Sequence, residues 1–183
     1  MTPARAVPPH PALARAEAWA GRFTAALNVV GTLLIVAVAV LVNADVIGRA
    51  ALSAPISGVP EMVSLSIVCI VFLQAAEAAR QGRFIRSDAL LLRLAARAPR
   101  AAAALEALWC GLALWLVAVI GTTTWPLMLR AWERGTFVGA VGDFTAPVWP
   151  VKAIIVTGCA ALALQFALGM LRALLGLTRR GAR

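Results

Sequence analysis

The stretch FTAALNVVGTLLIVAVAVLVNA, residues 23–44, decides the fold of this chain. It carries no charged residue, and about 20 apolar residues in a helix are enough to cross the hydrocarbon core of a bilayer. Two further charge-free runs follow at 107–129 and 153–171, and a fourth apolar stretch carries one glutamate near each end. We therefore predict an all-α integral membrane protein with four transmembrane helices, at about 23–44, 59–79, 105–129 and 150–171.

The composition of the chain excludes a soluble protein. Apolar residues make up 62% of the 183 positions, so too few polar side chains remain to cover four helices of this length in water. The formal net charge is +9. In a membrane protein such an excess of arginine indicates membrane lipids with anionic headgroups, and not nucleic acid, as the partner.

The basic residues are sorted between alternate connections of a four-span chain. Thirteen of the 17 Lys and Arg residues lie in the N-terminal tail, the middle connection and the C-terminal tail. The other two connections contain only Arg49, Arg130, Arg134 and Lys152. Because Lys and Arg are retained on the cytoplasmic side of a membrane, both termini and the middle connection are predicted to be cytoplasmic.

The segments outside the spans have distinct compositions. We expect residues 1–16, rich in Pro, Ala and Arg, to be a disordered tail, residues 17–178 to form the membrane domain, and residues 179–183 to be a basic tail. In the middle connection, a capping Asp88 precedes leucines and arginines at helical spacing, which predicts an amphipathic interfacial helix at about 87–98. Arginine would face headgroups and leucine would face acyl chains; the arginines assigned to the lipid interface are Arg86, Arg93, Arg97 and Arg100.

Tryptophan supports the same topology. Five of the six tryptophans fall at predicted span ends, as an aromatic belt at the membrane interfaces requires. Trp109, Trp125 and Trp149 are assigned to the lipid interface, and Trp19 and Trp132 fall at the same levels.

Polar residues cluster where the first span ends and the second begins. Asn43 precedes Asp45 and Arg49, which are four apart, share a helix face and can form an ion pair. Glu61 follows a proline in the first turn of the second span, where the helix dipole favours a carboxylate. Its candidate partners are Arg49 and a second subunit.

A second polar group lies at the other end of the second span. Gln74 and Glu77 are about one turn apart, and Arg80 is three residues beyond Glu77. An internal Glu77–Arg80 pair is the first interpretation, and a polar contact between subunits is the alternative.

Recognisable catalytic motifs and clusters of metal-ligating residues are absent from the sequence. The single histidine is His10, and the three cysteines fall inside predicted spans without a CxxC pair. There is no P-loop or serine-nucleophile motif, and no acid lies at the centre of a span. We therefore predict no enzymatic activity, no cofactor and no metal site. We expect the chain to pack against a larger partner.

Several residues also fit the pattern of a known family. They are Asn43-x-x-Val46-x-x-Arg49, Glu61, the stretch AAEAARQGRFIRSD at 75–88, and Pro147-x-Trp149-Pro150. In their order and topology, over roughly residues 20–175, they resemble the small membrane subunit, of the DctQ type, of TRAP (tripartite ATP-independent periplasmic) transporters. Two positions depart from it: Phe84 stands where the family commonly has His, and Gly58-Val59-Pro60 where it often has Trp.

This resemblance implies a function. The chain would be an accessory subunit in the bacterial inner membrane that braces a large multi-span transport subunit, in sodium-coupled uptake of an organic acid delivered by a periplasmic substrate-binding protein. The structural or subunit-interface residues would be Asn43, Asp45, Arg49, Glu61, Gln74, Glu77, Arg80 and Asp88. The alternative is a self-sufficient, homo-oligomeric small exporter or channel that uses Glu61.

Overall fold

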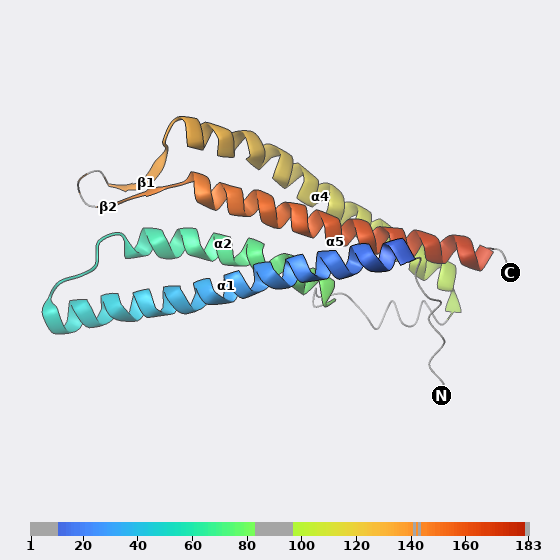
Figure 1. The fold of residues 1–183 in the computed structure, drawn as a ribbon, viewed down its shortest axis with the longest axis horizontal. Coiled ribbons are helices and arrows are strands. Elements are labelled where there is room, and N and C mark those ends of the chain that lie inside the picture. Colours follow the sequence, from blue (N-terminus) through green and yellow to red (C-terminus); the bar gives the residue numbers. More distant parts are fainter. Residues whose placement is uncertain (1–10, 83–96, 141, 143, 182–183) are drawn as a thin grey trace.

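The fold is known from a computed structural model, which describes residues 11–82, 97–140, 142 and 144–181. Four long helices and one small hairpin make up these residues (Figure 1). The elements in order are α1 (Pro11–Leu52), α2 (Val59–Arg80), α4 (Pro99–Glu133), β1 (Phe137–Ala140), β2 (Phe144–Pro147) and α5 (Trp149–Gly181).

Each of the four helices contains a segment long and apolar enough to cross a membrane, so the predicted number of spans is confirmed. These segments are Ala14–Leu52, Val59–Arg80, Ala101–Glu133 and Trp149–Leu175. The predicted interfacial helix at 87–98 lies almost wholly outside the described residues.

The helices are longer than the apolar runs from which they were predicted. Helix α1 begins at Pro11, inside the expected tail 1–16, and ends at Leu52, well beyond residue 44. Proline suits a first helical turn, and the Ala, Leu, Arg and Glu residues that follow favour a helix. At 1.5 Å per residue, the 42 residues of α1 span about 63 Å, which exceeds the ~30 Å of the hydrocarbon core. Helix α5 likewise continues to Gly181, into the expected basic tail 179–183.

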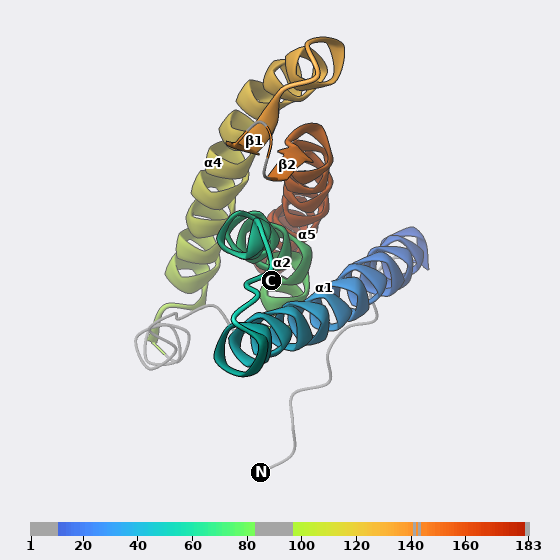
Figure 2. The same ribbon diagram turned by 90° about the vertical axis from the view of Figure 1, so that its left-hand side faces the viewer.

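The helices pack as two antiparallel pairs. Helix α1 lies along α2, α4 lies along α5, and the two pairs meet where α2 packs against α5 (Figures 1 and 2). Figure 2 shows α1 crossing the other helices obliquely. Because four helices alternate in direction, the start of α1 and the end of α5 lie at the same end of the molecule, which we call the terminal end (Figure 1). We call the opposite end the hairpin end.

Close backbone approach holds the two pairs together. A Cβ atom added at Gly158 of α5 would lie 2.5 Å from the carbonyl oxygen of Phe72 on α2 and 2.8 Å from its Cβ. Any larger residue at this position would therefore push α2 and α5 apart. The buried residues around this contact form the main apolar cluster: Ala76, Val117, Cys159, Ala161 and Leu162.

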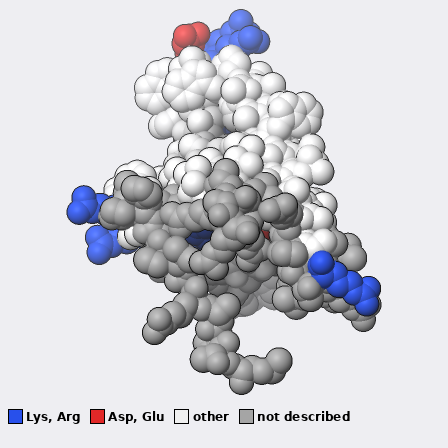
Figure 3. Space-filling model, turned by 90° about the vertical axis from the view of Figure 1, so that its right-hand side faces the viewer, with Lys and Arg blue, Asp and Glu red and all other residues white. Residues whose placement is uncertain are grey.

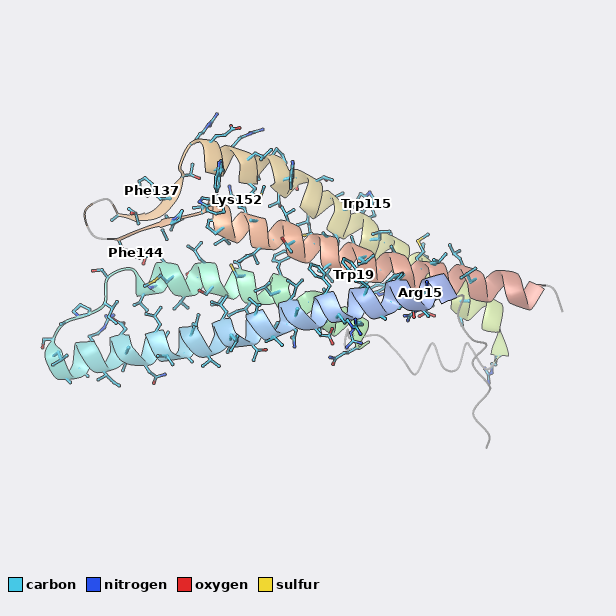
Figure 4. All side chains as sticks on the ribbon, in the orientation of Figure 1. Arg15, Trp19, Trp115, Phe137, Phe144 and Lys152 are labelled. Atoms are coloured by element: carbon cyan, nitrogen blue, oxygen red, sulfur yellow. The ribbon has the colours of Figure 1, made fainter. Side chains whose placement is uncertain are left out.

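The hairpin between α4 and α5 was not predicted from the sequence. Its antiparallel strands pair Phe137 with Pro147 and Ala140 with Phe144. Each strand has only four residues, too few for an alternating pattern to stand out beside the long apolar runs. A Cβ added at Gly58, where φ is +78°, would overlap the ring of Phe144, so the hairpin reaches back to the connection between α1 and α2. Figure 4 labels Phe144 at this end of the molecule.

Candidate functional site

A polar cluster surrounds Glu77, near the end of α2. The Glu77 carboxylate accepts hydrogen bonds from the Thr24 hydroxyl at 2.8 Å, from the Gln81 amide at 2.7 Å, and from Arg80 Nε at 2.8 Å and Nη2 at 2.5 Å. Glu77 is 5% exposed and Thr24 is fully buried. The carboxylate is thus satisfied inside the chain, and it joins α2 to α1.

Two further polar contacts join helices near this cluster. Arg172 Nε on α5 donates to the Glu17 carboxylate on α1 at 2.5 Å. Closer to the middle of the span, the Gln74 amide donates to the Thr32 hydroxyl at 3.4 Å, a long hydrogen bond. Of the predicted residues, Gln74, Glu77 and Arg80 therefore contact α1 or each other.

A second polar cluster lies at the hairpin end. Asp45 is buried, and its Oδ2 accepts a hydrogen bond from Arg49 at 2.7 Å. Its Oδ1 accepts the backbone N–H of Ile56 at 2.9 Å. One carboxylate near the end of α1 therefore holds the connection that leads to α2. The sequence indicated the pair with Arg49, but it gave no indication of the bond to Ile56.

Two of the predicted residues at this end form no hydrogen bond or ion pair with another element among the described residues. The Asn43 amide donates to the carbonyl of Ala39 in its own helix at 2.7 Å. Glu61 is partly buried in the first turn of α2, and it forms no hydrogen bond or ion pair with a residue that the structure describes. Arg49, its nearest candidate partner in sequence, is bound to Asp45.

Five of the six tryptophans are exposed on the outside of the bundle, and Trp149 is half-buried. Trp109 and Trp125 are about half exposed on α4. Trp132 and Trp149 pack edge to face at 4.4 Å between ring centroids, which joins the end of α4 to the start of α5. Trp19 stacks on Phe23 at 5.8 Å near the terminal end of α1, where Figure 4 labels it.

Two of the arginines assigned to the lipid headgroups belong to the described part of the chain. Arg97 is exposed, and Arg100 lies in the first turn of α4. Asp88, Arg86 and Arg93 lie outside the described residues. Figure 3 views the molecule from its terminal end, and most of the blue Lys and Arg side chains that it shows stand at the margin of this view.

A cavity lies among the helices at the terminal end. Its volume is about 560 Å³, and residues of α1, α2, α4 and α5 line it. The charged lining residues are Glu17, Arg80, Glu106 and Arg172. The sequence gave no indication of this cavity, because four segments far apart in the chain form it.

The structure also locates the residues considered for metal or redox chemistry. The three cysteines are buried in three different helices: Cys69 in α2, Cys110 in α4 and Cys159 in α5. Within the described ranges, no three His, Cys, Asp or Glu side chains are grouped so that they could hold a metal ion.

Comparison with known proteins gives one match. Residues 38–176 match the model of a protein family described as "Tripartite ATP-independent periplasmic transporters, DctQ component". No curated protein and no solved structure matches the chain. The matched segment includes the clusters around Asp45 and Glu77, whereas Glu17 and Thr24 precede it.

Proposed function

Because the chain belongs to the DctQ family of tripartite ATP-independent periplasmic transporters, we propose that it braces the large transport subunit of such a transporter. The family match makes the chain a small component of a TRAP transporter, and four apolar helices make it a multi-pass membrane protein. The observation that carries the proposal is this match over residues 38–176. A match to a transporter component does not favour the alternative of a self-sufficient exporter.

A bracing role needs a subunit whose helices keep fixed positions. Polar ties at both ends support this property: Glu77 joins α1 to α2 at the terminal end, and Asp45 fixes the connection between the same helices at the hairpin end. Between α2 and α5, the approach at Gly158 leaves no space for sliding without repacking.

A bracing role also needs a surface for the larger subunit. Helix α1 keeps little of its apolar segment inside the bundle, and Leu33, Val36, Val40 and Ile47 are exposed on it. In a bilayer, this surface is available to lipids and to another membrane protein. Glu61 is partly buried and forms no ion pair within the described ranges, and Arg49 is exposed. These two are the polar residues that we assign to the subunit contact at the hairpin end.

The remaining features follow from the family resemblance and the arginine distribution. We propose a position in the bacterial inner membrane with both termini cytoplasmic, and sodium-coupled uptake of an organic acid delivered by a periplasmic substrate-binding protein. The hairpin end would then face the periplasm, on the side where that protein arrives.

Reconstitution tests this function. Liposomes containing the large subunit, the chain and the binding protein should take up substrate when sodium is supplied outside. The same liposomes without the chain should take up at most a small fraction of it. Equal uptake with and without the chain would refute the bracing role, and uptake by the chain alone would support the exporter.

A further inference from the structure

The cavity at the terminal end has a lining that combines opposite charges. Glu17 and Glu106 supply carboxylates, and Arg80 and Arg172 supply guanidinium groups. Each of these residues lies within about two helical turns of the end of its apolar segment. In a bilayer, the cavity would therefore lie at the level of the lipid headgroups.

Arg172 can bind a second anionic group. Its side chain is 59% exposed, and its hydrogen bond to Glu17 uses only Nε. Its two terminal nitrogens form no hydrogen bond with a residue that the structure describes. Such a pair suits the oxygens of a phosphate group in a bidentate arrangement. Arg80, in contrast, uses Nε and Nη2 for Glu77.

Gln165 gives an independent indication of a ligand. Its side-chain nitrogen Nε2 is buried and has no hydrogen-bond partner in the part of the chain that the structure describes, although the residue lines the cavity. A buried amide donor without an acceptor is unfavourable, so a ligand oxygen near it would be stabilised.

The rest of the lining is apolar. Cys110, Phe166 and Leu168 contribute to the wall between the charged residues. A ligand that fits this cavity therefore has a phosphate, a cationic amine and an adjoining apolar part, and the volume is in the range of small-molecule sites.

We infer that the cavity binds the headgroup of a phospholipid that carries both a phosphate and a primary amine. The phosphate lies against Arg172 and Gln165, and the amine lies toward Glu17. This lipid site does not depend on the proposed transport function, because its lining belongs to the chain alone.

Native mass spectrometry of the full-length chain tests the inference. The chain is purified in detergent and offered an equal mixture of phosphatidylethanolamine, phosphatidylglycerol and phosphatidylcholine. The wild type should retain phosphatidylethanolamine at least fivefold over the other two lipids. Gln165→Leu should remove most of this retention while it leaves both ion pairs in place, and Arg172→Ala should do the same. Glu17→Gln should shift the preference toward phosphatidylglycerol, because the amine loses its carboxylate.

The matched control is Arg130→Ala, which removes a guanidinium that does not line the cavity. Unchanged retention in this control supports the assignment. Wild-type retention in Gln165→Leu and Arg172→Ala, or an equal loss in Arg130→Ala, would overturn it. Free phosphoethanolamine or inorganic phosphate that displaced the lipid at equal concentration would also overturn it, because the site would then belong to a soluble phosphate compound.

Discussion

The Thr24 hydroxyl on α1 donates a 2.8 Å hydrogen bond to the Glu77 carboxylate on α2, and both side chains are buried. The same carboxylate is held by Arg80 and Gln81 from its own end of α2. An ionised group at this depth needs several donors, and Thr24 is the one that comes from another helix. The pair therefore fixes the position of α1 along α2.

Replacing Thr24 should weaken the attachment of α1 to α2 and lower the stability of the chain. Thr24→Val keeps the volume of the side chain and removes the donor, and a hydrogen bond to a charged group is worth about 1.5–3 kcal/mol. We expect a lower apparent melting temperature of the purified chain in detergent, followed by tryptophan fluorescence. Thr123→Val is the matched control, because the Thr123 hydroxyl bonds only to carbonyl groups of its own helix. Equal melting temperatures for the two variants would show that the Thr24–Glu77 bond contributes nothing.

Removing the Asp45 carboxylate should loosen the connection between α1 and α2. In Asp45→Ala, the backbone N–H of Ile56 loses its acceptor, and its hydrogen exchange should accelerate by about tenfold or more. Hydrogen–deuterium exchange of the purified chain measures this directly. Asn43→Ala is the control, because the Asn43 amide bonds to the carbonyl of Ala39 and not to the connection. Unchanged exchange at Ile56 in Asp45→Ala would contradict the assignment.

The contact at Gly158 should tolerate no side chain. Gly158→Ala places a methyl group against the Phe72 backbone, and overpacking of this kind costs about 1–3 kcal/mol. We expect a lower melting temperature and a smaller monodisperse fraction in size-exclusion chromatography. Gly111→Ala is the control, since the atom nearest to its new Cβ would be Met170 Sδ at 3.9 Å. If both variants behave like the wild type, α2 and α5 are not in the close contact described above.

Charge reversal at the hairpin end should weaken subunit assembly. Glu61→Lys and Arg49→Glu each invert a charge that we assign to the contact with the large subunit, and like charges across such a contact are unfavourable. We expect several-fold less large subunit to co-purify with either variant. Glu133→Lys, an exposed acid at the end of α4, serves as the control. Full recovery of the complex from both variants would remove Glu61 and Arg49 from the interface.

The sequence predicted the spans because hydropathy is a local property. The charge-free run at 23–44 is enough to identify a membrane helix, and the spacing of Asp45 and Arg49 is enough to indicate their pair. The position of Thr24 beside Glu77 depends on how two helices pack, and 53 residues separate the two side chains. The bond to Ile56, the hairpin and the cavity depend on the same tertiary information, so the local pattern could not predict them.

The claim that the chain braces a large transport subunit is tested most directly by affinity purification. The tagged chain is purified from its native membrane in mild detergent, and the co-purifying proteins are identified. A small bracing subunit should bring with it one large multi-span membrane protein in stoichiometric amount. Recovery of the chain alone or as a homo-oligomer, together with solute movement by that material in liposomes, would contradict the account.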